Sequence, residues 1–161
     1  MNDDDLSTCK YQSKHFLYNT ASTVQGGAIK FDGECINCII SESIFISNSA
    51  HYCGALSTDT SGGSNDISII DSVFYYNQAV SEISIGGGAA CINDALVSII
   101  NCTFVGNTAA ALGGAMSFDN SEITITDSVF SNNVAGFSGG ALITYASSSN
   151  YTIRSSIFID N

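Results

Sequence analysis

Apolar and polar residues alternate in short segments along this chain, and the same arrangement returns roughly every 26 to 30 residues. In each segment two apolar positions flank one that is most often serine or threonine, which is the period of two expected of a β-strand buried on one face. The pattern predicts strands whose inward positions are the seventh and the fifth residue before a recurring phenylalanine. These pairs are Cys38 and Ile40, Ile67 and Ile69, Val97 and Ile99, Ile123 and Ile125, and Tyr151 and Ile153.

The recurring phenylalanine begins a Phe-x-x-Asn motif. A small residue two positions before it predicts a corner at which the chain bends. We expect the rings to enter the core, and the asparagines to satisfy backbone groups and one another in the turn that follows. The six motifs are Phe16 to Asn19, Phe45 to Asn48, Phe74 to Asn77, Phe104 to Asn107, Phe130 to Asn133 and Phe158 to Asn161.

A second motif, Gly-Gly-Ala followed by an apolar residue, occurs once in each interval between the phenylalanines. Two copies depart from it, because Cys53 replaces the first glycine of one and Ala90 replaces the branched residue of another. The second glycine is present in every copy, which predicts a point where one backbone passes close to another. These glycines are Gly27, Gly54, Gly88, Gly114 and Gly140.

A repeat with one strand pattern before the phenylalanine and another after the glycines cannot bury its own apolar face. Stacked in register, successive repeats pair in parallel about 4.8 Å apart and place like residues in rows. The sequence therefore predicts an all-β fold, a right-handed single-stranded parallel β-helix of about five coils. We expect one domain over residues 1–161, as a segment of a longer repeat protein, with structural roles for the phenylalanine, asparagine and glycine rows.

The interleaved glycine and Phe-x-x-Asn motifs resemble the repeat signature of the chlamydial polymorphic membrane proteins and of similar β-helical surface proteins. The resemblance covers residues 16–161. It implies a passenger-like β-helix displayed on a cell surface, with adhesion as its activity. No secretion signal is visible near Met1, so the expected extracellular or cell-surface location follows from the resemblance.

The chain is strongly acidic, with four basic and fifteen acidic residues and a net charge of -11. This charge repels phosphate backbones and anionic membranes, so nucleic acid is not an expected partner. Repulsion between molecules also keeps a stack of sheets in solution. No run of 18 apolar residues occurs, and we expect no direct membrane insertion of this segment.

One polar column is a candidate for carbohydrate chemistry, which β-helices often perform. Adjacent carboxylates about 5 Å apart would suit a retaining glycosidase pair or a calcium site. The alternative is a solvated row on an outer face, favoured because four basic residues are few for neutralising acidic sugars. The column, three residues before each phenylalanine, reads Glu42, Asp71, Asn101, Asp127 and Ser155.

Six cysteines leave three alternatives open. Cys35 and Cys38 have the spacing of half a zinc site or of a redox motif, with Cys53 as a possible third ligand. One or more disulfides are the second alternative. Mostly free thiols are the third and the favoured one, because Cys38 and Cys102 fall at inward positions where Ile or Ser occurs in other coils, as expected of a small buried apolar residue. We predict no metal and no cofactor. The remaining cysteines are Cys9 and Cys91.

Other motifs carry weaker signals. His15 and His51 share no column with a nucleophile and a carboxylate, so they predict no hydrolytic triad. Residues 86–88 are three glycines without the Gly-Lys-Ser/Thr of a phosphate-binding loop. Asn101 and Asn150 begin glycosylation triplets, which an Asn-rich and Thr-rich chain produces by chance.

The sequence predicts no catalytic residues, and the expected function is a non-catalytic adhesin-like scaffold for attachment or surface architecture. Segments 57–65 and 79–85 lengthen the repeat, and such insertions usually carry binding. Possible partners are a host surface, a matrix or a carbohydrate ligand. The alternatives are a polysaccharide lyase or hydrolase, and a mechanical spacer or filament component that self-associates end to end.

Overall fold

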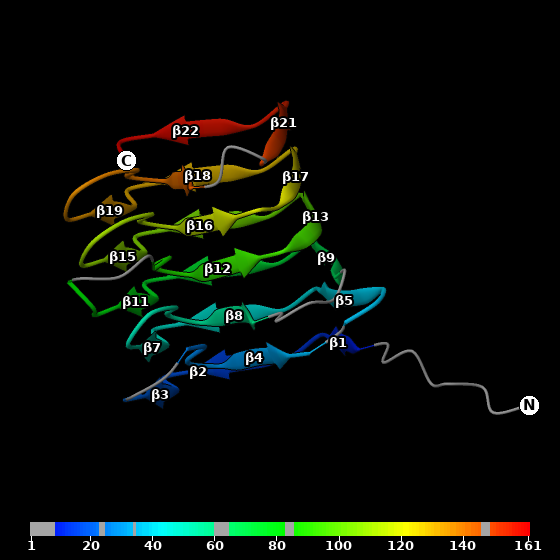
Figure 1. Cartoon of the computed structure of the whole chain (residues 1–161), viewed down its shortest axis with the longest axis horizontal. Coiled ribbons are helices and arrows are strands. Elements are labelled where there is room, and N and C mark those ends of the chain that lie inside the picture. Colours follow the sequence, from blue (N-terminus) through cyan, green and yellow to red (C-terminus); the bar gives the residue numbers. More distant parts are fainter. Residues whose placement is uncertain (1–8, 23–24, 34, 60–64, 83–85, 146–148) are drawn as a thin grey trace, which may run out of the picture.

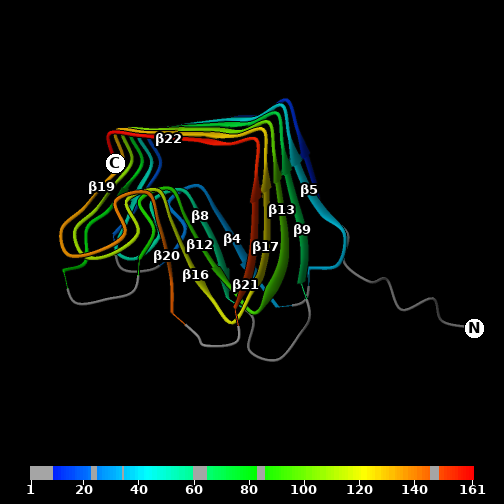
Figure 2. The same ribbon diagram turned by 90° about the horizontal axis from the view of Figure 1, so that it is seen from above.

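The structure is a computed structural model. It describes residues 9–22, 25–33, 35–59, 65–82, 86–145 and 149–161. These residues form a parallel β-solenoid of about five coils without helices (Figure 1). Each complete coil contributes one strand to each of four parallel sheets, which we name sheets A, B, C and D in chain order. Seen from above, the coils wind in a right-handed sense (Figure 2). The predicted all-β parallel β-helix is confirmed.

Sheet A contains the strand that precedes each phenylalanine. Its side chains alternate between buried and partly exposed, as in β9, because the inward positions are apolar and the outward ones mostly polar. Neighbouring strands pair in the register that the columns predict, with Ile67 beside Cys38 and Val97 beside Ile67. The strands are β1 (Lys10–Gln12), β5 (Cys38–Ser41), β9 (Asn65–Ile70), β13 (Ala95–Ile100), β17 (Glu122–Thr126) and β21 (Asn150–Arg154).

Sheet B contains the phenylalanines at the centre of its strands. Their rings form one continuous stack, with adjacent centroids 4.5 to 4.7 Å apart and planes within 11° of parallel. Four of the rings are completely buried, so each contributes roughly 1.5 to 3 kcal/mol by burial. The strands are β2 (His15–Leu17), β6 (Ile44–Ile46), β10 (Val73–Tyr75), β14 (Thr103–Val105), β18 (Val129–Ser131) and β22 (Ile157–Ile159).

Sheet C consists of two-residue strands that directly follow the asparagines, and the sequence patterns did not predict it. Each strand ends in an alanine, and those of β7, β11 and β15 are buried. A small side chain suits this position because the glycine motifs lie close by. The strands are β3 (Thr20–Ala21), β7 (Ser49–Ala50), β11 (Gln78–Ala79), β15 (Thr108–Ala109) and β19 (Val134–Ala135).

Sheet D begins at the last residue of each glycine motif and closes the coil. Its inward side chains meet those of sheets A and B in one apolar core, which includes Leu56, Ile92, Met116 and Phe118. The strands are β4 (Ile29–Asp32), β8 (Leu56–Asp59), β12 (Ala90–Asn93), β16 (Met116–Asp119) and β20 (Leu142–Thr144).

The asparagines form a hydrogen-bonded ladder along the axis. Asn77 accepts at Oδ1 from the backbone N–H and the Nδ2 of Asn48, at 3.0 and 2.9 Å. Its own Nδ2 donates to the backbone oxygen of Phe45 and to Oδ1 of Asn107, at 3.1 and 3.0 Å. The same bonds recur from Asn19 to Asn161. Each side chain thus satisfies backbone groups that the turn leaves without sheet partners.

The second glycines lie where the backbones of successive coils touch. A Cβ placed on Gly54 would overlap the carbonyl oxygen of Gly88, and one on Gly88 would overlap that of Gly114. The first glycine differs, since Gly26, Gly113 and Gly139 adopt left-handed φ values of about 70°. The chain therefore needs these glycines for two different physical reasons.

The two ends of the solenoid differ from its centre. At the first coil, the ring of Tyr11 packs edge-on against Phe16 and Phe31, with centroids 6.1 Å away in each case. At the last coil, an apolar cavity of about 240 Å³ opens between sheets A and D. The cavity is lined by Phe118, Ile123, Ile125, Leu142, Ile143, Thr144, Tyr151 and Ile153.

The described part of the chain holds no helix long and apolar enough to cross a membrane.

Candidate functional site

The predicted carboxylate column lies at the corner between sheets A and B, where the backbone turns left-handed. Glu42, Asp71 and Asp127 have φ values of 49°, 49° and 51°. Asn, Asp and Ser tolerate this conformation because their short polar side chains bond locally. Left-handed backbone favours short polar residues at this corner, and Ser13, Asn101 and Ser155 occupy the same position with φ values of 52°, 51° and 47°.

The carboxylates of this column bond to the polar residues of neighbouring coils. Ser13 Oγ donates to Glu42 Oε2 at 2.8 Å, and Asn101 Nδ2 donates to Asp71 Oδ1 at 2.7 Å. The residue after each column position also links successive coils. For example, the backbone N–H of Ser43 donates to Ser72 Oγ of the next coil at 3.1 Å. The carboxylates thus link the side chains of successive corners, and Asn101, which begins a glycosylation triplet, is one of these partners.

The remaining predicted candidates lie apart from the carboxylate column. His15 is exposed on β2, and His51 packs edge-on against Tyr52 beyond β7 with a centroid distance of 4.5 Å. Asn150, the other glycosylation candidate, is exposed at the start of β21. Residues 86–88 lie against backbone of other coils. Of the longer segments, residues 60–64 and 83–85 lie outside the described residues, so the structure does not test those two candidates.

Four of the six cysteines form disulfides, and the expectation of mostly free thiols is wrong. Cys53 is bonded to Cys91 of the next coil, with Cα atoms 5.5 Å apart. Cys53 is therefore not a third ligand beside Cys35 and Cys38, which bond to each other across a Cα distance of 5.8 Å. The columns did not predict the Cys53–Cys91 pairing, because Cys91 lies at an outward position of sheet D. It is nevertheless 3% exposed, and its Sγ accepts from the backbone N–H of Gly87 at 3.1 Å.

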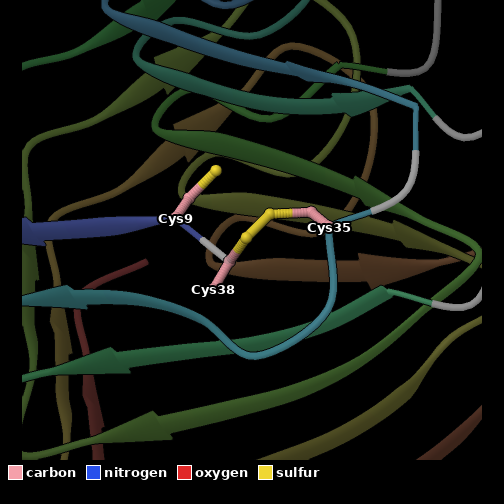
Figure 3. Close-up of side chains that lie close together, drawn as sticks. All are labelled: Cys9, Cys35 and Cys38. Carbon is pink, nitrogen blue, oxygen red and sulfur yellow. A yellow bond between two sulfur atoms is a disulfide. The ribbon is translucent and has the colours of Figure 1, made fainter. Parts of the chain in front are cut away.

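The third cysteine near Cys35 and Cys38 is Cys9. The three sulfur atoms lie within 4.8 Å of one another, at the start of β1 and beside the start of β5 (Figure 3). Cys35 and Cys38 are buried, and Cys9 is partly exposed with a free thiol. In the reduced state these are three soft donors of the kind that bind zinc. The signal was in the sequence, because Cys9 and Cys38 are both seven residues before a phenylalanine.

The outer face of sheet B is the largest feature that the sequence analysis overlooked. The residues on either side of each phenylalanine point outward, and nine of the twelve are apolar, with Tyr75 counted among them. No described segment covers this side of the sheet (Figure 2). We call it the sheet B face. It comprises His15, Leu17, Ile44, Ile46, Val73, Tyr75, Thr103, Val105, Val129, Ser131, Ile157 and Ile159.

This face is flat, regular and nearly uncharged. Strands β2, β6, β10, β14, β18 and β22 pair in strict register, so its rows repeat at the spacing of parallel strands, about 4.8 Å. Its end residues Leu17, Ile157 and Ile159 are 43%, 51% and 48% exposed, and its central residues are partly exposed. Contiguous exposed apolar patches of this kind mark interaction sites on soluble proteins.

Two different polar edges border the sheet B face. The edge shared with sheet A is the corner column that contains Glu42, Asp71 and Asp127. The opposite edge, two residues after each phenylalanine, also has left-handed backbone, and it reads Tyr18, Ser47, Tyr76, Gly106, Asn132 and Asp160. The rings of Tyr18 and Tyr76 are exposed, so they offer phenolic donors on this edge, whereas Glu42, Asp71 and Asp127 offer carboxylate acceptors on the other.

Comparisons of the chain with protein-family models, with curated proteins and with solved structures find no match. The expected likeness to polymorphic membrane proteins therefore depends on the repeat motifs alone.

Proposed function

We propose that this chain is a non-catalytic structural scaffold that contributes to surface architecture, and that its sheet B face binds the same face of a second copy. The observation that carries the proposal is the row of apolar side chains outside the phenylalanine stack. Two such sheets packed face to face about 10 Å apart bury both sets of side chains. Burial of this apolar area favours association by roughly 25 cal/mol per Å² before the costs of binding.

Charge supports a second copy as the occupant. Apart from the face itself, the molecule is acidic, with a net charge of -11, and contact through most of its surface would bring carboxylates together. The sheet B face carries no carboxylate, and His15 is its one basic residue among the twelve. Pairing through this face keeps like charges out of the interface.

The two edges favour one arrangement of the pair. With the two-fold axis parallel to the solenoid axis, the strands of the two copies run antiparallel, and the acidic edge of one copy lies over the tyrosine edge of the other. On the central coils this brings the carboxylate of Asp71 toward the hydroxyl of Tyr76. The alternative axis, parallel to the strands, would place the two acidic edges opposite each other and is disfavoured by repulsion.

The disulfides support a location outside the reducing cytosol. Cys53–Cys91 joins adjacent coils and Cys35–Cys38 closes a corner, and such bonds persist in oxidising compartments. We propose that the scaffold functions extracellularly or at a cell surface.

The test is sedimentation velocity across a wide concentration range. We expect the unmodified chain to form dimers and the double substitution Ile46→Glu with Val105→Glu to be monomeric, because each carboxylate would be buried against an apolar face. The matched control, Ser68→Glu with Thr124→Glu, adds the same charge to the outer face of sheet A and should dimerise like the parent. A parent chain that stays monomeric, or equal dimerisation of both variants, contradicts the proposal. A monomeric parent that binds a matrix or glycan through this face would instead support adhesion.

A further inference from the structure

We propose that Cys9, Cys35 and Cys38 form a thiol–disulfide exchange site, in which the Cys9 thiolate attacks the Cys35–Cys38 disulfide and transfers it to Cys9–Cys38. The inference does not depend on the proposed function. It rests on a free thiol whose sulfur lies within 4.8 Å of both sulfurs of a disulfide (Figure 3). In this reaction a thiolate attacks a disulfide sulfur to which it has access.

Strand register identifies which sulfur is attacked. Lys10 pairs with Ile39 in the parallel ladder of β1 and β5, so the preceding residues, Cys9 and Cys38, are neighbours on adjacent strands. The backbone N–H of Ile39 donates to the oxygen of Cys9 at 2.8 Å, which holds the two strand starts together. Residues so paired have Cα atoms about 4.8 Å apart, within the range of 4.4 to 6.8 Å that a disulfide spans.

The exchange is balanced within the chain. Cys9 loses its proton and its sulfur forms a bond to Cys38 Sγ, while the bond between Cys38 Sγ and Cys35 Sγ breaks. The electron pair of the broken bond goes to Cys35 Sγ, which takes up a proton and becomes the free thiol. The number of disulfides does not change, so no external oxidant or reductant is consumed.

The two isomers constrain the molecule differently. Cys35–Cys38 joins residues three positions apart, at the corner that leads into β5. It leaves β1 held by its ladder to β5, the one strand that pairs with β1 among the residues that the structure describes. Cys9–Cys38 would instead tie the first strand of the solenoid to the second. Among the described strands, β1 pairs with β5 alone, so it can open locally at the N-terminal edge of sheet A. A Cys9–Cys38 bond would prevent this opening. Exchange at this site would therefore link β1 covalently to β5 or release it.

The access of the three sulfurs fits these roles. Cys9, the attacking thiol, is partly exposed to water, whereas Cys35 and Cys38 are 2% and 1% exposed. External thiols therefore reach the buried disulfide less readily than Cys9 does. The other free cysteine, Cys102, is buried in a central coil and serves as the internal control.

The experiment maps thiols and disulfides in the intact oxidised chain. The chain is held at mildly alkaline pH, quenched with acid, unfolded, alkylated under acidic conditions and digested, and the peptides are identified by mass spectrometry. We expect two populations, one with the alkyl label on Cys9 and one with the label moved to Cys35. Incubation that is kept acidic throughout should prevent the movement, because the thiolate is the nucleophile.

Variants check the same proposal separately. Cys35→Ser should form Cys9–Cys38 on mild oxidation and slow amide hydrogen exchange in β1 relative to Cys9→Ser, which retains only Cys35–Cys38. Cys102→Ser should leave the label pattern at Cys9 and Cys35 unchanged. A label confined to Cys9 at every pH in the parent chain would overturn the proposal. This outcome is measured on the parent chain, so it does not depend on whether a variant folds. Protection of all three thiols by a tightly bound metal ion would overturn the proposal equally.

Discussion

The central and terminal coils contain the same motifs, but their residues are buried to very different extents. The rings of Phe45, Phe74, Phe104 and Phe130 are 0% exposed, whereas that of Phe158 is 41% exposed. Sheet A shows the same contrast, since Ile69 is 0% exposed and Ile153 is 42% exposed. Burial in this fold is therefore supplied by the neighbouring coils and not by the repeat itself.

This contrast indicates that the contribution of each motif to the free energy of unfolding depends on how many coils flank it. A central strand pairs on both edges, and its side chains contact the coils on both sides. A terminal strand such as β22 pairs on one edge. Matched substitutions at equivalent positions of central and terminal coils should therefore differ in their cost, although the sequence changes are identical.

The largest difference is expected for the phenylalanine stack. Phe74→Ala removes a fully buried ring with stacked neighbours at 4.5 and 4.7 Å, and such truncations cost about 3 to 5 kcal/mol. Phe158→Ala removes a half-buried ring with one stacked neighbour and should cost about 1 to 2 kcal/mol by lost burial. Urea unfolding of both variants measures the two free energies. Equal costs would mean that the stack is not cooperative with its flanking coils.

The next effect concerns the close approach of backbones. In Gly88→Ala the new Cβ would collide with Gly114 O and lie 2.7 Å from Thr108 N, so we expect a loss of about 3 kcal/mol from overpacking. Gly140→Ala is the matched control, because the three atoms nearest its Cβ all belong to Asn161, the first being the carbonyl carbon at 2.5 Å. Asn161 has a neighbouring coil on one side and can shift. Thermal unfolding should rank Gly88→Ala well below Gly140→Ala, and the reverse order would contradict the assignment.

The phenylalanine stack and the glycine contacts are the parts of the fold that the sequence predicts best. The phenylalanine and glycine positions repeat, so their columns predict rows, and the register of sheets A and B follows directly. Sheet C could not be predicted, because two-residue strands such as Thr108–Ala109 carry no periodicity. The sheet B face was missed for another reason. Its residues lie directly before and after an inward phenylalanine. Where they are apolar too, the strand is a continuous apolar run, and such a run does not indicate which side chains face outward.

The cysteines show a different limit of sequence reasoning. Column logic identifies Cys9 and Cys38 as neighbours, because both precede a phenylalanine by seven residues. It does not identify Cys53 and Cys91, which belong to different columns. Their meeting depends on the local backbone of the second coil, where Cys53 replaces a glycine that is left-handed in other copies such as Gly113. Departures from a repeat are thus the positions that the repeat cannot predict.

A smaller effect is expected in the asparagine ladder. Asn77→Ala leaves the side-chain Nδ2 of Asn48 and the backbone oxygen of Phe45 without their partners in a buried turn, at a cost of about 1 to 3 kcal/mol. Asn161→Ala removes the same bonds to Asn133 and Phe130 at a part-buried position. Water can replace them there, so we expect less than half the loss. Chemical denaturation compares the two, and similar losses would show that the terminal turn is as dry as the central one.

The smallest effect is a pH dependence at Cys102, the one corner residue of a central coil that carries a thiol in place of the serine hydroxyl. Burial raises the pKa of Cys102 from its ordinary value of 9.0 to about 11. The folded state therefore keeps its proton when the unfolded chain has begun to lose it. The resulting stability is complete below pH 9 and is lost as the pH rises from 9 to 11.

Cys102→Ser isolates this contribution, because serine occupies the same position in neighbouring coils as Ser72 and Ser128. The hydroxyl should donate to the oxygen of Ile100, as Ser72 does to Ile70 at 2.8 Å. Between pH 7 and pH 10, we expect the free energy of unfolding of the parent to fall by about 1.4 kcal/mol more than that of the variant. Urea midpoints at the two pH values measure the difference. If the two proteins respond alike, the thiol of Cys102 is hydrated in the folded state, and the central coils are less dry than their phenylalanine stack indicates.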